Sequence, residues 1–501
     1  MLPLHIKEFL SECNLEILQY RPNVVRARAN SSVSGRLPPL SQTTRRPAAA
    51  VLEVQAERAS APRPKAPWPL VAVLRRAAFA ALLIAAHSRA AAMPSEAGEP
   101  AFSVHARCGA ARTGTLRGGL ETPAVLLYTR RGFPAPLTLR ELRSLSGSVP
   151  NSGPEPAALG VQVSAAELID EPGAAVLRKV PGGLKEFCGL HGRNDLVLLS
   201  ARDSLTIQAG MPASDGWATL QTPAGQKKVT AAEYGELVGA VQPDVVVCLA
   251  DEVFADSNDK KMKKSVDRTA LWMDECIKAR ADARIPAKTL IFGPIVGGLS
   301  ERERAASAQE AAKREELDGY ALLGFGSGES SEARLSLMKS SLEPLNAAKP
   351  RFITGLGAPN EILWCAAHGF DLIESAYAYL AAAQGIALTF NTDYDDLIAF
   401  RPGQSGIFTP GAGGKLNLWD TSLSRDTRPI VEGCKCFACG NYTRAYVHHL
   451  LNTHEMLAEV FLTCHNQHVM LTFMRSIRQA IARDSLPQFA DAFCAVRAAG
   501  R

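Results

Sequence analysis

The sequence predicts an α/β fold, a (β/α)8 TIM barrel, from about residue 101 onward. Short β-like apolar runs alternate with helical stretches, and this alternation continues for more than 250 residues of the 501-residue chain. Repeated βα units favour a parallel sheet with helices outside, and at this length a closed barrel. A doubly wound open sheet is the structural alternative, but no G-x-G-x-x-G opens a helix after the first predicted strand.

The predicted strands follow one another as short apolar segments. They are AVLLY (124–128), DLVLL (195–199), DVVVCL (244–249), TLIF (289–292), YALLG (320–324) and RFITG (351–355). Helix start signals lie between them. Ser300 followed by Glu303 forms a capping box before a helical run to Glu316. Pro359 is expected at the first helical position of PNEILWCAAHG, which ends at Gly369.

Residues 1–100 are predicted to form a separate N-terminal extension, and residues 101–501 the folded part. The extension holds 13 Lys/Arg and 7 Asp/Glu, and between residues 17 and 95 its acids are Glu53 and Glu57. This Arg-rich, acid-poor composition is typical of a targeting peptide, while a disordered extension or a start at Met93 is the alternative. Arg75 and Arg76 divide its apolar stretch, which argues against a membrane span. We therefore expect a cytoplasmic protein, associated with or imported into the mitochondrion or another organelle.

The folded part is close to electrically neutral. The whole chain carries +5, of which the extension contributes +6, so residues 101–501 carry −1. Bulk charge therefore gives no sign of strong, autonomous nucleic-acid binding. Lys260, Lys261, Lys263 and Lys264 form a local basic run. A solvated helix face is the simpler interpretation of this run, and a phosphate-contacting patch is the alternative.

Four of the eleven cysteines fall within 31 residues, and they predict a metal site. Cys434, Cys436 and Cys439 place three thiols within six residues, which suits one Zn²⁺ ion in a reducing compartment. A structural zinc site needs a fourth ligand. Spacing alone leaves several candidates open for it: His448, His449, His454, Cys464, His465 and His468.

This region resembles the zinc subdomain of the queuine tRNA-ribosyltransferase (tRNA-guanine transglycosylase) family. That family carries C-x-C-x2-C followed after 25 residues by a histidine in an H-N pair, and His465-Asn466 has this spacing from Cys439. The resemblance therefore implies that one structural zinc ion is bound by Cys434, Cys436, Cys439 and His465. It also implies a zinc subdomain at about 415–480, inserted in the barrel.

The resemblance covers most of residues 105–485. The matching segments are ARTGTL (111–116), TPAVLLYTRRG (122–132), PIVGGLSERERAASAQEAAK (294–313), LDGYALLGFGSGE (317–329), ITGLGAPNEILWCAAHGFDLIES (353–375) and GIALTF (385–390). Members of this family are (β/α)8 barrels that exchange the wobble guanine of certain tRNAs for a 7-deazaguanine base. The eukaryotic enzyme pairs a catalytic with an accessory subunit.

Several positions depart from the catalytic pattern. Catalytic members carry a nucleophilic Asp in F-D-C-V-x-P-T-R, and this sequence has Glu374 at that place, in IESAYAYL. The D-S-G-G-F-Q acid/base motif is missing from LLSARDSLTIQAG (198–210), where Asp203 is nearby but is not aligned with it. The base-contacting I-V-Q-G and G-G-L motifs read IVGG (295–298) and LGF (323–325), whereas Asp251 matches the family's base-recognising Asp. We therefore expect no catalytic residues.

The segments LLYTRRG (126–132), GFGSGE (324–329) and ESAYAY (374–379) resemble those of accessory subunits. The resemblance thus implies a non-catalytic subunit that pairs with a catalytic subunit. Together they would exchange guanine 34 for queuine in tRNAs with GUN anticodons, and tRNA would be bound through the complex. A homodimer is a further option. The alternative is an active transglycosylase that uses Glu374 as its nucleophile.

Overall fold

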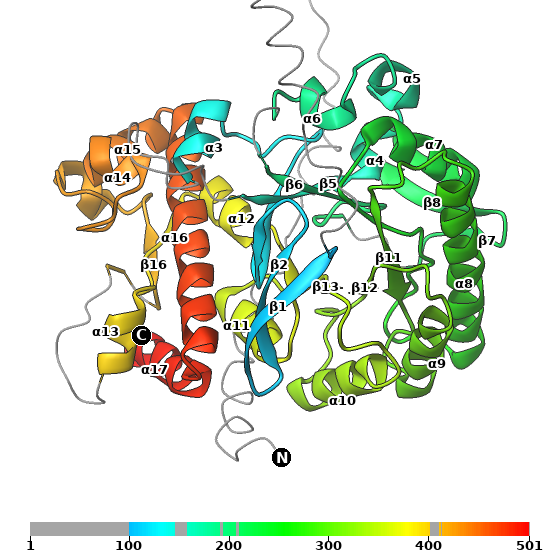
Figure 1. Ribbon diagram of the computed structural model, residues 1–501. Helices are drawn as coiled ribbons and strands as arrows, with labels where there is room; N and C mark the ends of the chain where they lie inside the picture. The colour runs from blue at the N-terminus through cyan, green and yellow to red at the C-terminus, as the bar shows by residue number, and fades with distance from the viewer. Residues whose placement is uncertain are drawn as a thin grey trace, which may run out of the picture. The chain divides into compact units, whose positions relative to one another are not determined.

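The computed structural model describes residues 100–145, 158–190, 194–206, 210–400, 410–411 and 413–499. The expectations for the N-terminal extension fall on residues 1–99 and lie outside the described part. Within the described part, the core is a closed barrel of eight parallel strands, so the predicted fold class is confirmed (Figure 1). In barrel order the strands are β10 (Val245–Val247), β11 (Leu290–Ile295), β12 (Gly319–Leu322), β13 (Arg351–Ile353), β14 (Leu372–Ser375), β4 (Ala124–Tyr128), β5 (Gly160–Ser164) and β6 (Leu196–Ser200).

All six predicted strands are strands of this barrel. The two that the sequence did not reveal are β5 and β14, of sequences GVQVS and LIES. Both are short and contain polar residues. These polar residues, Gln162 and Glu374, are buried, which the next section explains.

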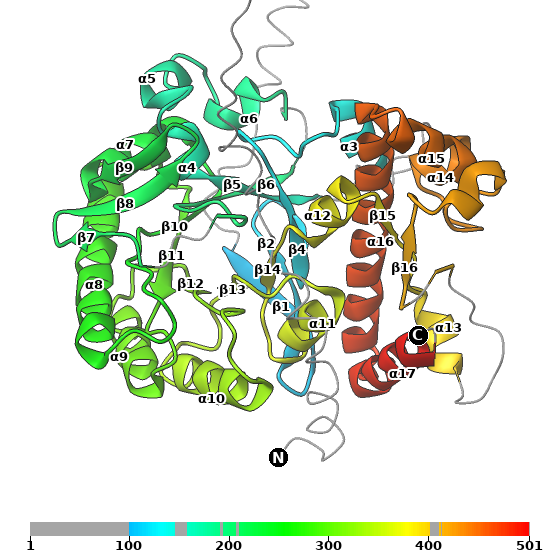
Figure 2. The same cartoon turned by 180° about the vertical axis from the view of Figure 1, so that it is seen from behind.

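Helices cover the outside of the barrel, as Figure 2 shows from behind. They are α3 (Leu139–Leu145), α4 (Ala165–Leu168), α5 (Gly173–Leu177), α6 (Gly183–Phe187), α7 (Ala231–Val241), α8 (Asp259–Ala281), α9 (Glu301–Ala312), α10 (Ser331–Leu342), α11 (Pro359–Ala367) and α12 (Tyr377–Ala383). The Ser300 hydroxyl accepts a hydrogen bond from Glu303 N at 3.3 Å and starts α9, which ends at Ala312 rather than Glu316. Pro359 begins α11 as predicted.

The barrel interior is apolar at its amino-terminal end. Alternate residues such as Leu126, Leu198 and Phe292 point inward and form one buried cluster, because side chains alternate across a strand. An antiparallel sheet of β1 (Phe102–Cys108), β2 (Ala111–Leu116) and β3 (Leu120–Thr122) contributes Leu116 and Leu120 to the same cluster. The interior is therefore packed below, and chemistry is left to the carboxyl ends of the strands.

A second antiparallel sheet lies against α8. It consists of β7 (Ala213–Ser214), β8 (Trp217–Thr222) and β9 (Gly225–Val229). Trp272 of α8 donates a hydrogen bond to the Asp215 carbonyl at 2.9 Å, and Arg268 forms an ion pair with the Asp215 carboxylate at 3.1 Å. These two contacts fix the sheet on the helix.

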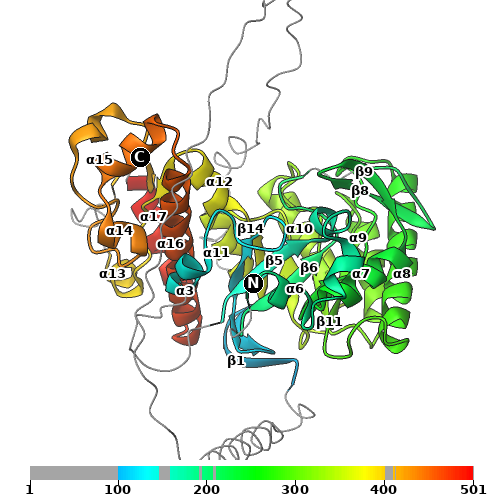
Figure 3. The same ribbon diagram turned by 90° about the horizontal axis from the view of Figure 1, so that it is seen from above.

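The C-terminal segment packs beside the barrel and has its own apolar cluster, as the view from above shows (Figure 3). Its elements are β15 (Ile386–Leu388), α13 (Tyr394–Ala399), β16 (Lys415–Asn417), the 3-10 helix η2 (Thr421–Arg425), α14 (Phe437–Asn441), α15 (Arg444–Asn452), α16 (Met456–Ala482) and α17 (Leu486–Ala499). The 27-residue α16 packs against both α12 of the barrel and α14 and α15 of this segment. None of the helices in the described ranges combines the length and apolarity that a membrane crossing requires.

Candidate metal centre and barrel mouth

Three cysteines and one histidine meet in the C-terminal segment. The ligand atoms of Cys434, Cys436, Cys439 and His465 all lie within 4.8 Å of one another. The distances from His465 Nδ1 to the three Sγ atoms are 3.8, 3.5 and 3.4 Å in that order. A tetrahedral zinc ion with Zn–S of about 2.3 Å and Zn–N of about 2.1 Å requires S···N separations of about 3.6 Å. The four side chains thus have the geometry and chemistry of a closed zinc site.

A second layer of hydrogen bonds orients the histidine. His465 Nε2 lies 2.8 Å from the Leu388 carbonyl oxygen, so a proton on Nε2 leaves Nδ1 free to face a metal. The neighbouring Asn466 accepts a hydrogen bond from Leu388 N at 2.8 Å and donates to the Ile386 carbonyl at 2.9 Å. The His-Asn pair therefore fastens α16 to strand β15 and aims the imidazole at the cysteines.

Local backbone geometry presents the cysteines. Cys436 is the N-cap of α14, and its Sγ accepts a hydrogen bond from Cys439 N at 3.3 Å. Cys464 belongs to a different environment: it is fully buried beside the Ser144 side chain, and burial raises its pKa to about 11. Of the other candidate ligands, His448 bonds the Leu418 carbonyl at 2.8 Å, while His468 approaches Cys434 from outside the four-residue cluster.

At the carboxyl end of the barrel, Glu374 is enclosed by hydrogen-bond donors. Its Oε1 accepts from Gln162 Nε2 at 2.6 Å and from Ser204 Oγ at 2.8 Å, and its Oε2 accepts from Gly355 N at 3.0 Å. The residue is 5% exposed. A nucleophilic carboxylate must bring one oxygen to the anomeric carbon, so each hydrogen bond that this oxygen gives up on the way adds to the cost of attack. Here both oxygens have hydrogen-bond partners. Gln162 comes from β5, Ser204 from the loop after β6 and Gly355 from the loop after β13.

Arg202 adds a positive charge to this network. Its guanidinium lies 3.5 Å from Glu374 Oε2 and 3.1 Å from Glu252 Oε1. Burial raises the pKa of Glu252, and the nearby Arg202 opposes this shift. The side chains of Arg202 and Glu252 are 17% and 14% exposed. An arginine thus bridges the two carboxylates that stand at the mouth of the barrel.

The other groups expected to read a base also have partners within the protein. Asp251 forms an ion pair with Arg268 at 3.0 Å. The buried Arg304 of α9 donates to the carbonyl oxygens of Gly298 at 2.7 Å and Leu323 at 3.2 Å. Its guanidinium lies 4.2 Å from the centre of the Phe325 ring. The loops that correspond to the base-reading motifs are thus held by Arg304.

Asp203 lies near Arg202, and among the described residues no hydrogen bond joins it to Glu374. Its Oδ2 accepts from the Thr206 hydroxyl at 2.9 Å, and its neighbours are Tyr128 and Glu167. Burial raises the pKa of both Tyr128 and Glu167. No sequence pattern marks Arg202, Gln162 or Arg304, because their roles depend on which loops the closed barrel brings together.

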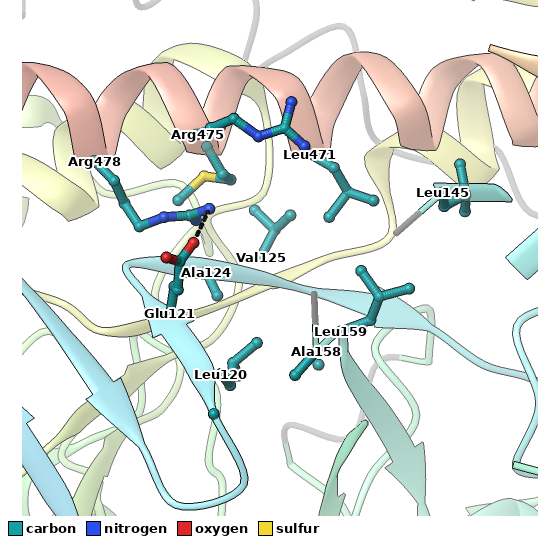
Figure 4. Close-up of a pocket in the computed structure, with 13 residues that line it drawn as sticks. Leu120, Glu121, Ala124, Val125, Leu145, Ala158, Leu159, Leu471, Arg475 and Arg478 are labelled. Carbon is teal, nitrogen blue, oxygen red and sulfur yellow. Dashed lines mark hydrogen bonds and ion pairs between the residues drawn. The ribbon is translucent and has the colours of Figure 1, made fainter. Parts of the chain in front are cut away.

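Figure 4 shows a small cavity at the opposite, amino-terminal end of β4, beside α16. Leu120, Leu159 and Leu471 line it, and Arg478 donates hydrogen bonds at its edge to Glu121 at 3.1 Å and to the Pro123 carbonyl at 3.0 Å. Because this end of a barrel usually serves stability, we interpret the cavity as part of the joint between α16 and the barrel.

Comparison with known proteins identifies the family. Residues 103–499 match the sequence profile described as "Queuine tRNA-ribosyltransferase". The chain is 33% identical over 392 residues to the queuine tRNA-ribosyltransferase accessory subunit 2 of Pongo abelii and, over the same length, of Homo sapiens; each alignment covers 74% of this chain and 91% of the relative. The Danio rerio protein of the same name is 32% identical over 407 residues, covering 75% and 94%. This chain therefore belongs to the queuine tRNA-ribosyltransferase (tRNA-guanine transglycosylase) family.

Proposed function

We propose that this protein is a non-catalytic accessory subunit of queuine tRNA-ribosyltransferase. It would pair with a catalytic subunit that exchanges guanine 34 for queuine in tRNAs with GUN anticodons. The observation that carries this proposal is the enclosure of Glu374 by Gln162, Ser204 and Gly355, with Arg202 beside it. The names of its relatives, accessory subunits of this enzyme, support the same reading.

The alternative, an active enzyme that uses Glu374, would require this network to open. Glu374 would have to leave three hydrogen bonds and an arginine before it could approach the ribose. It is also one methylene longer than Asp, and a displacement of about 1 Å can cost roughly a hundredfold in rate. Two groups at the expected base-contact positions also have partners within the protein, since Arg268 pairs with Asp251 and Arg304 donates to the Leu323 carbonyl.

The C-terminal segment supplies a surface suited to a protein partner. Tyr446, Met456 and Leu457 are 39%, 74% and 42% exposed and lie on α15 and α16, the elements next to the metal cluster. Beneath them Tyr442 stacks on Phe461 with ring centres 3.9 Å apart. Exposed apolar groups on a rigid support are typical of protein interfaces. We propose that the catalytic subunit covers them and that zinc, when bound, holds this support in shape.

Exchange of labelled guanine in tRNA tests the proposal. The chain alone should give no exchange, the catalytic subunit alone little, and the mixture the most. Glu374→Gln keeps the size of the side chain but removes the nucleophilic charge, and it should leave the mixture's rate unchanged. Exchange by the isolated chain that disappears in Glu374→Gln would establish the alternative.

Pairing can be tested separately by sedimentation. Met456→Arg should weaken the heterodimer, because it places a charge in the proposed apolar contact. Leu271→Arg is the matched control, since Leu271 is 50% exposed on α8, outside the C-terminal segment. A homodimer that persists when the catalytic subunit is added would contradict the proposed heterodimer.

A further inference from the structure

The first two turns of α8 carry four lysines in an unusual setting. Lys260, Lys261, Lys263 and Lys264 are all exposed, while Met262 between them is 4% exposed and anchors the helix. Across the described ranges, none of the four makes an ion pair within 4.0 Å. The four ammonium groups therefore face solvent without a charged partner from the described chain.

Asp259 suits the start of this helix and stands four positions before Lys263, but the lysines add unfavourable positive charge to the same turns. The amino end of a helix has a partial positive charge, so cations are disfavoured in its first turn and favoured in its last. Lysines at 260 and 264, 260 and 263, and 261 and 264 also stand at spacings where like charges repel. Lys278 and Arg280, in the last turn of the same helix, are placed as the dipole prefers. Such a local conflict is expected where residues serve binding rather than folding.

An exposed aromatic ring stands beside the lysines. Phe254 is 50% exposed, and Lys261 Nζ lies 5.8 Å from its ring centre. The ring packs so closely on Gly210 that a Cβ there would lie 2.1 Å from Phe254 Cε2. Gly210 also has φ +78°, which favours glycine. The ring is thus held from one side and open to solvent on the other.

Topology places this group at the functional end of the barrel. The helix α8 follows β10, so its first turns lie on the side where the strands end, the side that also carries Glu374. The folded part as a whole carries −1, so the lysines form a local patch rather than part of a general basic surface. Cations with an adjacent exposed ring suit a phosphate backbone with an unstacked base, because lysines neutralise phosphates and bases stack on aromatic rings.

We infer that Lys260, Lys261, Lys263, Lys264 and Phe254, here called the α8 patch, contact the tRNA on which the catalytic partner acts. The lysines bind phosphates, and Phe254 stacks against an unpaired base. This inference rests on the proposed function, because that function brings tRNA to the assembly. It adds the surface by which the accessory subunit contributes to tRNA affinity.

The test replaces the four patch lysines with glutamine in the full chain. The matched control replaces Lys278, Lys288, Lys313 and Lys339, four exposed lysines outside the patch, so both variants lose the same charge. The probe is a labelled tRNA transcript with a GUN anticodon, titrated with the heterodimer by fluorescence anisotropy from 50 to 200 mM KCl. The patch variant should bind at least tenfold more weakly at 100 mM salt, and the control less than twofold.

Salt dependence distinguishes phosphate contacts from indirect effects. Each lost phosphate contact should reduce the slope of log K against log salt by about 0.7–0.9. Phe254→Ala should weaken binding without changing this slope. Equal affinities and slopes for the patch and control variants would overturn the inference. Loss of anionic-vesicle binding with unchanged tRNA affinity would also overturn it and assign the lysines to a membrane surface.

Two further readouts separate this inference from the proposed function. Sedimentation first establishes whether the wild-type heterodimer forms, and its absence contradicts the proposed function alone. The isolated chain is then titrated with the same transcript, so the patch is tested in either case. The patch variant should have a melting temperature close to that of the wild type, because all four lysines are exposed and none forms an ion pair within 4.0 Å in the described ranges. A lower melting temperature together with loss of the heterodimer would indicate a structural role and overturn the inference.

Discussion

Replacing Arg202 with alanine tests whether the barrel mouth is a closed electrostatic network. Arg202 lies 3.1 Å from Glu252 and 3.5 Å from Glu374. After the replacement, Glu374 keeps its three hydrogen-bond donors, but Glu252 loses its ion-pair partner. The main cost in folding free energy therefore comes from the Glu252 carboxylate, which is 14% exposed and no longer has a positive charge in contact.

The expected loss follows from this burial. Removing one partner of a buried ion pair costs about 3–5 kcal/mol, and the partial exposure of Arg202 and Glu252 favours the lower end. The family profile spans residues 103–499. At about 2.1 cal/mol/K per residue, the unfolding entropy of this span is about 0.8 kcal/mol/K. A loss of about 3 kcal/mol should therefore lower the melting temperature by roughly 4 °C at pH 8.

The loss should also depend on pH. Burial already raises the pKa of Glu252 in the folded protein, and removal of Arg202 raises it further. A folded pKa above the unfolded value gives stability that is complete below the unfolded pKa and is lost as pH rises through the folded pKa. The variant should therefore approach the wild type near pH 4.5 and differ most at pH 8.

Differential scanning calorimetry at both pH values measures this difference. Arg178→Ala is the control, because its ion pair with Glu236 has side chains 52% and 44% exposed and should contribute less than about 1 kcal/mol. Adding Glu252→Gln to Arg202→Ala removes the unpaired charge and should recover most of the loss at pH 8. An equal loss of melting temperature at both pH values, or no recovery in the double variant, would refute the inference that Arg202 neutralises Glu252 in the barrel mouth.

Three further outcomes are expected. Cys436→Ser should release the one zinc ion per chain that metal analysis should find in the wild type, whereas Cys464→Ala should retain it; a folded, zinc-free wild type would contradict the metal site. In the heterodimer, disruption of the cluster by Cys436→Ser should abolish pairing in sedimentation, and unchanged pairing would separate the metal from the interface. Deletion of residues 1–100 should change the melting temperature of the remaining chain by no more than about 1 °C. A reporter fused to those residues should reach an organelle, and a diffuse cytosolic reporter would reject targeting.

The sequence predicted the fold because the barrel strands are marked by local patterns. Runs such as AVLLY and DVVVCL are apolar enough to predict buried parallel strands, and all six runs predicted in this way form strands of the barrel. The strands β5 and β14 were not predicted, because Gln162 and Glu374 interrupt their apolar sequences. These two polar residues bond each other inside the barrel, so the pattern failed where the barrel mouth has its polar network.

The metal cluster was more accessible to prediction than the barrel mouth. Three of its four cluster residues lie within six positions, and the family spacing singled out His465, which the fold brings against the cysteines. The mouth depends instead on contacts between distant segments: Gln162, Ser204 and Gly355 reach Glu374 across 212, 170 and 19 positions. Only barrel closure sets those contacts, so no local pattern could reveal that Glu374 is enclosed.

The enclosure of Glu374 also bears on the stability of the barrel mouth. An active site holds a carboxylate partly unsatisfied so that it can react, and such strain or exposure costs stability. In this protein the Glu374 carboxylate accepts hydrogen bonds from neutral donors and lies beside Arg202. Arg304 donates hydrogen bonds to the carbonyl oxygens of Gly298 and Leu323 in the loops that correspond to the base-reading motifs. Shortening Glu374 to Asp would leave both arginines in place. The substitution would therefore leave the Arg268–Asp251 ion pair and the Arg304–Leu323 hydrogen bond unchanged, so a shorter carboxylate alone would not rebuild the expected base contacts.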